Sequence, residues 1–301
     1  MRTPQRTEIE SAVERVRRVP SQHREYVHDV ATARRTHGIP EDLLKELLDV
    51  GLPHGRANGT IAMDGLDLAN VSFMLGLPSA RAMALRGWAT ALRAARSEQA
   101  ALYTLTVAPH CLDPGCEKAC EFSIAPEVAG HFGTDGEIDA VTGCVVHRRA
   151  AGGSVLLPDE MRALTAQLAS VEFHLLPPAL QNDVGFLRSA QLADCPLAAE
   201  FLFREAGRRG FAARKSFGIF MAVPYSIPHM WIDLLVDGEW LPVDPLLLAM
   251  LASRGIIDAA DWLPFRTLGG VAWRLHGEDV PLALHGGQKT TYSLPTMKQE
   301  V

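Results

Sequence analysis

Residues 194–215 read DCPLAAEFLFREAGRRGFAARK, and their spacing predicts a single helix with one buried face. Asp194 is placed to cap this helix, and Pro196 is tolerated in its first turn. Gly207 or Gly210 can end it. The residues that recur at helical spacing, and therefore share the inward face, are Cys195, Ala198, Ala199, Leu202 and Ala206.

Cys195 falls in the first turn of this helix, where the helix dipole and the unbonded backbone N–H groups favour a thiolate. The same N–H groups can stabilise the oxyanion that forms when a thiolate attacks a carbonyl. Position alone also fits a small apolar residue at the start of a core helix. Cys195 is therefore a candidate nucleophile that still needs a base.

The residues that follow predict an antiparallel hairpin. The runs FAARKSFGIFMAV (211–223), MWIDLLV (230–236) and EWLPV (239–243) have the composition of strands. Asp237 and Gly238 separate the last two runs, and Asp-Gly is a strong signal for a two-residue hairpin loop. A helix followed by antiparallel strands indicates the α+β fold class.

The register of this hairpin selects a partner for His229. With residues 237–238 as the loop, His229 and Trp231 point to one face, because strand side chains alternate. Asp244 joins that face as a diagonal neighbour of His229, about 7–8 Å away at the backbone. Asp233 shares the face, but four residues along one strand span about 13 Å. We therefore predict a His229–Asp244 pair, although each residue taken alone is more typical of a structural role.

The run from Cys195 to Pro245 resembles the bacterial transglutaminase-like superfamily. The motifs are CPLAAEFLFREAGRRGFAARKSFG from residue 195, HMW from residue 229 and DGEWLPVDP from residue 237, in the family's order and spacing. The resemblance implies a papain-like α+β fold with Cys195 as nucleophile, His229 as general base and acid, and Asp244 orienting the imidazole. HMW stands where the family has His-Ala-Trp, and DPLLL lacks its usual threonine.

Three more side chains are candidates around this triad. Gln191, four residues before Cys195, is a candidate oxyanion donor, although a polar loop residue is the simpler interpretation. Trp231 and Trp240 are candidates for the core and for walls of an acyl pocket.

The composition of the 301 residues is ordinary for a globular protein, with a net charge of −6. The charge and the lack of a long basic tract argue against nucleic-acid binding. The longest uncharged run, residues 216–232, is interrupted by prolines, and the N-terminus is charged throughout. Five cysteines without a secretion signal fit a reducing compartment. We expect a cytoplasmic protein that does not bind a membrane.

The first hundred residues predict helices. TEIESAVERVRRV (7–19) and IPEDLLKELLDVG (39–51) carry apolar residues at helical spacing. Residues 148–154, RRAAGGS, are typical of a linker. We therefore expect a mainly helical N-terminal region of unknown role at 1–153 and a catalytic domain at 154–301.

The run HCLDPGCEKAC (110–120) suggests a separate site. Four cysteines could hold a structural zinc ion, although their spacing is not that of two CxxC pairs, and unrelated thiols are the simpler interpretation. The candidate ligands are Cys111, Cys116, Cys120 and Cys144, with His110, His131 and His147 nearby. Catalysis itself requires no cofactor in this interpretation.

The function predicted from these features is cysteine-dependent acyl transfer through a thioester enzyme intermediate, forming an amide in small-molecule biosynthesis. The acyl donor would be a small molecule or be bound to a carrier protein, and the acceptor an amine. Basic residues near the end of the helix could dock an acidic carrier or be a solvated face: Arg204, Arg208, Arg209, Arg214 and Lys215. A thiol amidase or protease, a catalytically silent binding module, and a zinc-stabilised scaffold are the alternatives.

Overall fold

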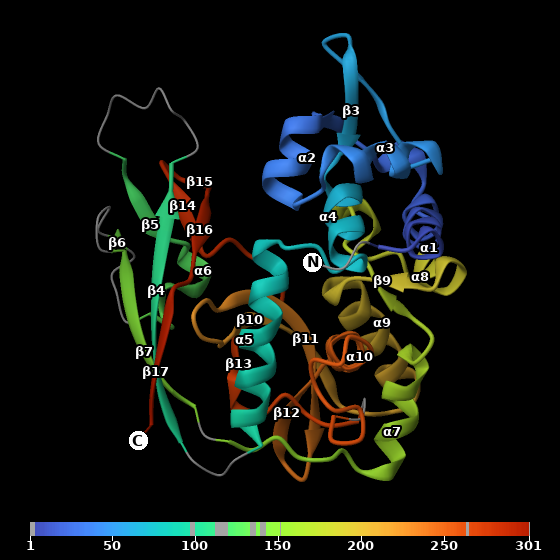
Figure 1. The fold of residues 1–301 in the computed structure, drawn as a ribbon. Helices are drawn as coiled ribbons and strands as arrows, with labels where there is room; N and C mark the ends of the chain where they lie inside the picture. The colour runs from blue at the N-terminus through green and yellow to red at the C-terminus, as the bar shows by residue number, and fades with distance from the viewer. Residues whose placement is uncertain are drawn as a thin grey trace. The chain divides into compact units, whose positions relative to one another are not determined.

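The computed structural model describes residues 4–96, 100–111, 120–132, 137–138, 143–150, 152–262 and 265–300. The chain divides into two compact units (Figure 1), a first unit of residues 1–85 with 170–197 and a second unit of residues 86–169 with 198–301. The predicted boundary at residue 153 does not coincide with this division. Helices and mainly antiparallel sheets make up both units, which confirms the α+β class.

The first unit packs helices around one apolar core. Its longer helices are α1 (Arg6–Arg17), α2 (Val30–His37), α3 (Glu41–Asp49), α4 (Gly65–Met74) and α8 (Val184–Ala190). A small antiparallel sheet has the order β1 (Tyr26–His28), β3 (Thr60–Asp64), β2 (Gly55–Ala57), and β8 (Glu172–Phe173) pairs in parallel with β9 (Leu192–Ala193). The predicted apolar stripes are confirmed as core residues: Ile9, Val13, Val16, Leu43, Leu44 and Leu47 are buried.

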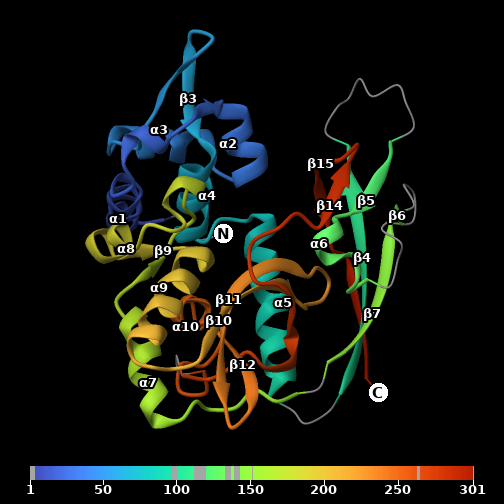
Figure 2. The same ribbon diagram turned by 180° about the vertical axis from the view of Figure 1, so that it is seen from behind.

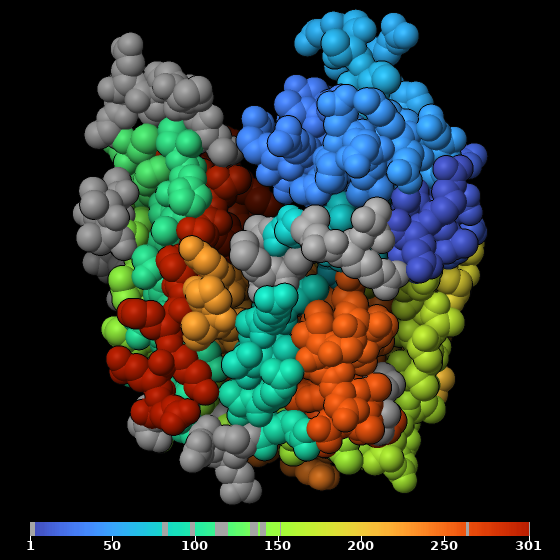
Figure 3. All heavy atoms as spheres, in the orientation of Figure 1, coloured from blue at the N-terminus to red at the C-terminus, as the bar shows by residue number. Residues whose placement is uncertain are grey.

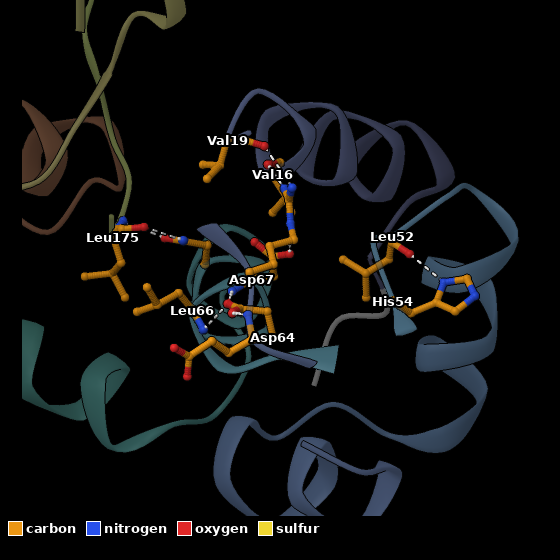
Figure 4. A network of polar contacts seen from close by, with 11 residues as sticks. Val16, Val19, Leu52, His54, Asp64, Leu66, Asp67 and Leu175 are labelled. Carbon is orange, nitrogen blue, oxygen red and sulfur yellow. Dashed lines mark hydrogen bonds and ion pairs between the residues drawn. The ribbon is translucent and has the colours of Figure 1, made fainter. Parts of the chain in front are cut away.

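A buried arginine joins the connection after α1 to α4 (Figure 4). The Arg24 guanidinium donates from Nε to Asp67 Oδ2 at 2.6 Å and from its two other nitrogens to the backbone oxygens of Val19 and Val16 at 2.8 and 2.7 Å. Both charged side chains are only 4% exposed. A buried guanidinium needs such partners, because every unpaired donor in an apolar interior costs free energy.

The side chain of Asn70 ties the segment that leads toward Cys195 to α4 (Figure 4). Asn70 Nδ2 donates to the backbone oxygen of Leu175 at 2.9 Å, and Leu175 N donates to Asn70 Oδ1 at 2.8 Å. The Asn70 amide therefore satisfies the backbone N–H and C=O of Leu175, as a neighbouring strand would.

The second unit contains the predicted hairpin. Its sheet has the order β12 (Glu239–Val243), β11 (Ile227–Val236), β10 (Ala213–Phe220), β13 (Ala272–His276), all antiparallel. Val236 pairs with Glu239 and Leu235 with Trp240, as the two-residue loop predicts. Asp237 and Gly238 have φ values of 50° and 85°, the left-handed pair that such a loop requires.

The other strands of the second unit lie mostly in a region whose sequence predicted no strands. The long strand β4 (Ala101–His110) pairs with β7 (Cys144–Ala150), β16 (Thr291–Ser293) and β17 (Thr296–Glu300). A further sheet has the order β15 (Gln288–Lys289), β14 (Ala283–His285), β5 (Phe122–Ile124), β6 (Glu137–Ile138). Residues 1–153 are therefore helical mainly up to Ala95, and the apolar faces of β4, β10 and β13 share one core.

The remaining longer helices are α5 (Ala80–Ala95), α7 (Asp159–Thr165), α9 (Cys195–Arg208) and α10 (Pro245–Ser253). Figure 3 shows the end of α5 beside α10 and the loop after it, where Arg93 Nη2 donates to Ile256 O at 2.9 Å and Arg96 pairs with Asp261 at 2.7 Å. Within the described ranges, no helix combines the length and the apolar character needed to cross a membrane.

Candidate active site

The centre of the candidate site is a buried imidazole–carboxylate pair. His229 is on β11, and its Nε2 lies 2.8 Å from Oδ2 of Asp244, the residue that follows β12. Both side chains are 3% exposed. The predicted pairing of His229 with Asp244 is thus confirmed as geometry, while the catalytic role of the two residues stays a prediction.

Asp244 is held by a second contact that comes from its place in the chain. It is the N-cap of α10, and its Oδ1 accepts a hydrogen bond from Leu247 N at 2.9 Å. Each oxygen of the carboxylate therefore has a fixed partner. Because an ionised carboxylate only accepts hydrogen bonds, the bond to His229 holds a proton on Nε2 and leaves Nδ1 of a neutral ring as the acceptor.

Aromatic rings fix the plane of the imidazole. Trp231 stacks on His229 with centroids 6.1 Å apart and planes 20° apart, and Phe220 meets the ring edge-on at 6.0 Å. Trp231 is itself held by Asp233, whose Oδ1 accepts from the indole Nε1 at 2.8 Å. Asp233 Oδ2 accepts from Ser216 Oγ and Arg214 Nε at 2.8 and 2.9 Å. Asp233 thus supports the tryptophan behind the histidine and does not replace Asp244.

The neighbouring strand must have a glycine opposite His229. Gly218 pairs with His229 across β10 and β11. A Cβ built on Gly218 would lie 2.0 Å from the backbone oxygen of Trp273 and 2.8 Å from the Trp231 ring. Only the absence of a side chain allows β13 and Trp231 to come this close.

Cys195 is the first residue of α9, as predicted, and is half-buried. Further along this helix Glu200 Oε2 accepts from Lys215 Nζ of β10 at 3.0 Å, which joins α9 to the sheet that carries His229. In the division of the chain given above, Cys195 belongs to the first unit, and His229 and Asp244 belong to the second. That the three residues act together stays a prediction.

Asp194 caps the start of α9. Its Oδ1 accepts from Leu197 N at 3.2 Å, so it caps the helix as predicted, and its Oδ2 accepts from Gln181 Nε2 at 2.8 Å. Desolvation by burial raises the pKa of Asp194 to about 6, against the lowering effect of the Gln181 and backbone hydrogen bonds. Nothing in the sequence indicated a role for Gln181, which lies outside the predicted helix.

A trio of thiol, imidazole and carboxylate can also bind a metal ion. Here His229 Nε2 and Asp244 Oδ2 are bonded to each other, and Asp244 Oδ1 is bonded to Leu247 N. Nδ1 of His229 is outside these bonds, whereas both oxygens of Asp244 already accept hydrogen bonds. The carboxylate is therefore arranged to orient the imidazole, which favours an acid–base arrangement.

The other predicted site residues have structural contacts. Gln191 ends α8 in the left-handed conformation, with its Oε1 accepting from Ser170 Oγ at 2.7 Å and its Nε2 donating to Arg188 O at 2.9 Å. These contacts lend no support to an oxyanion role. Trp231 is 1% exposed and belongs to the core, whereas Trp240 is 39% exposed and lies against the Arg214 guanidinium at 4.3 Å.

Most of the basic cluster is paired with acidic side chains. Arg204 and Lys215 both contact Glu200, at 2.6 and 3.0 Å. Arg208 pairs with Glu205, and Arg214 with Asp233. This local neutralisation weakens the case for docking an acidic carrier protein.

The cysteines of the predicted zinc site do not group as expected. Among the described residues, Cys111 and Cys120 form a group with His285, and Cys144 is not part of it. Cys144 is buried on β7, paired with Val107 of β4. Cys116 lies outside the described residues. The sequence could not indicate His285, because strand pairing brings it to the cysteines from a distant part of the chain.

In comparisons with known proteins, no protein-family model matches this chain, and no curated protein matches it significantly.

Proposed function

We propose that this chain is a cysteine-dependent acyltransferase with a transglutaminase-like core. The observation that carries the proposal is the buried hydrogen bond of 2.8 Å between His229 and Asp244, which gives an oriented imidazole. The position of Cys195 at the N-terminus of α9 adds to its support.

Each residue has a distinct role in the proposed reaction. Nδ1 of His229 takes the thiol proton of Cys195, and the thiolate attacks the carbonyl carbon of an acyl donor R–CO–X. The tetrahedral intermediate collapses, the C–X bond breaks, and X leaves with the proton from His229. An amine then attacks the thioester and gives its proton to His229. The C–S bond breaks, the amide is released, and His229 returns that proton to the sulfur of Cys195.

The proposed donor is a small-molecule thioester or amide, and the acceptor an amine of a biosynthetic pathway. The paired state of the basic residues around α9 makes a small donor the simpler choice over one bound to a carrier protein. Hydrolysis shares every step up to the acyl-enzyme, so the test must report which nucleophile resolves it.

The test is to trap the acyl-enzyme. The purified protein is mixed with N-acetylcysteamine thioesters of several chain lengths, and intact mass spectrometry follows the adduct on Cys195. We expect an added acyl mass in the wild type and in the control variant Cys144→Ala, none in Cys195→Ser, and amide product when a primary amine is present. Free acid alone, with the amine unused, would assign the chain to the hydrolases. The absence of an adduct with every donor would favour a silent binding module.

A further inference from the structure

Cys111, Cys120 and His285 form a second cluster of metal-ligating side chains, entirely within the second unit. Their ligand atoms lie within 4.8 Å of one another, and all three residues are half-buried. In a tetrahedral zinc site, ligands about 2.0–2.3 Å from the metal lie about 3.5–3.8 Å from each other. The three ligand atoms would therefore have to move only slightly closer together to reach that geometry.

Strand pairing next to each ligand determines where it lies. Cys111 directly follows β4, whose last residue, His110, pairs with Thr291 of β16 and accepts a 2.7 Å hydrogen bond from Thr290 Oγ1. Because the backbone is fixed at the residue before it, Cys111 has little freedom of position.

The other two ligands are positioned by the pairing of β5 with β14. His285 pairs with Phe122, and Gly286 N donates to the backbone oxygen of Glu121 at 3.0 Å, next to Cys120. The Phe122 and His285 rings lie 4.9 Å apart at 35°, which restrains the imidazole. Figures 1 and 2 both show β5 and β14 beside the end of β4.

The chemistry of these three side chains selects zinc. Thiolate sulfur and imidazole nitrogen are the donors of structural zinc sites, whereas calcium and magnesium take oxygen ligands. Two thiolates balance the charge of Zn²⁺ and the neutral imidazole adds none, so a bound ion would leave no net charge at the site.

We propose that Cys111, Cys120 and His285 bind one zinc ion that fastens the end of β4 to β5 and β14. Compared with the ligands predicted from the sequence, this site keeps Cys111 and Cys120, adds His285 from the C-terminal part of the chain and omits Cys144. Its free energy of binding adds to that of folding, because these segments come together only in the folded protein. The proposal does not depend on the catalytic role of Cys195.

The test measures zinc in the full-length chain after any affinity tag has been removed. Protein purified without chelators is analysed by plasma mass spectrometry, and Co²⁺ is titrated into the reduced, metal-depleted protein to record thiolate-to-cobalt absorption. The variants are Cys111→Ser, Cys120→Ser and His285→Gln, with Cys144→Ala and Cys195→Ser as controls. Circular dichroism reports the folding of each variant.

We expect about one zinc per chain in the wild type and in both controls, and at least a tenfold weaker affinity for Co²⁺ in each ligand variant that folds. If a ligand variant does not fold, the wild type is tested instead. Its midpoint of thermal unfolding should fall when a chelator removes the zinc and should recover when zinc is added. Zinc that is lost in Cys195→Ser and retained in Cys111→Ser would overturn the proposal. So would a Cys111–Cys120 disulfide whose reduced form binds neither zinc nor cobalt.

Discussion

His229 and Asp244 are joined by a hydrogen bond of 2.8 Å in a setting where each side chain is 3% exposed. The carboxylate that orients the imidazole also caps α10 through Leu247 N. The start of that helix and the orientation of the proposed base are therefore set by one residue, and substitutions at Asp244 can separate the two roles.

Asp244→Asn should keep the helix cap and lose the base. The asparagine Oδ1 can still accept from Leu247 N, but an N–H group then faces His229 Nε2 and moves the ring proton to Nδ1. We expect the alkylation rate of Cys195 near pH 7 to fall by about 10-fold to 10⁴-fold, the upper figure being the loss when a triad carboxylate becomes an amide. Peptide mass spectrometry after timed iodoacetamide labelling measures this rate.

The matched control for that experiment is Asp237→Asn in the same hairpin. Asp237 has a φ of 50° in the loop, a conformation that asparagine adopts readily. Its labelling rate should equal that of the wild type. Equal rates in both variants would remove Asp244 from the proposed mechanism.

Gly218→Ala should destabilise the second unit. The added methyl group would meet the backbone oxygen of Trp273 at 2.0 Å, and a paired strand cannot move cheaply. Overpacking of this kind costs about 1–3 kcal/mol. Urea unfolding followed by tryptophan fluorescence measures the loss, with Gly207→Ala as control, because a Cβ there meets nothing within 4 Å. A loss in Gly207→Ala as large as that in Gly218→Ala would contradict the account of this close approach.

Arg24→Ala should lower the free energy of unfolding far more than the loss of an exposed ion pair does. It leaves the Asp67 carboxylate and two backbone oxygens without their buried donor, which costs about 3–5 kcal/mol. Lys45→Ala breaks an exposed pair with Glu41, and we expect a loss below about 0.5 kcal/mol. Far-UV circular dichroism in urea follows both variants, and similar losses would refute the role of the Arg24 network.

Asp194 predicts a pH dependence of stability. Its pKa is about 6 in the folded chain, raised by burial, and near 3.8 when unfolded, so the folded state binds the proton more tightly. Its contribution to stability is therefore greatest below pH 3.8, falls as the pH rises toward 6, and is constant above. The difference between a pKa of 3.8 and one of about 6 corresponds to about 3 kcal/mol at most.

Asp194→Asn removes this titration and keeps a capping oxygen. The free energy of unfolding of the variant minus that of the wild type should increase between pH 4 and 6.5 and then level off. Denaturation in urea at a series of pH values, followed by circular dichroism at 222 nm, measures the difference. A difference that is constant with pH would show that Asp194 does not titrate in this range.

The sequence predicted well those features that depend on local spacing. The Asp-Gly loop fixed the register of β11 and β12, and the register placed Asp244 within reach of His229. The apolar stripe of α1 and the cap at Asp194 likewise depend on residues close together in the chain. Such features follow from backbone periodicity and turn geometry alone.

Features that depend on distant pairing could not be predicted. Strands β4 and β17 pair residues at opposite ends of the second unit, and His285 reaches Cys120 only because β14 pairs with β5. Gln191 lies close to Cys195 in sequence, yet the left-handed turn at the end of α8 directs its amide to Ser170 and Arg188. No periodicity in the sequence encodes these contacts.

If the proposed mechanism is correct, Cys195 and His229 act as an activated pair, and the alkylation of Cys195 then depends on pH in a way that an ordinary thiol does not show. Labelling by iodoacetamide is followed from pH 5 to 10 in the wild type and in His229→Ala, with Cys111 as an internal comparison. We predict that Cys195 reacts well below pH 8.5, the ordinary pKa of a thiol being about 8.5, and that His229→Ala abolishes this early reaction. If Cys195 reacts no earlier than Cys111 and is unaffected by the substitution, the proposed mechanism is wrong.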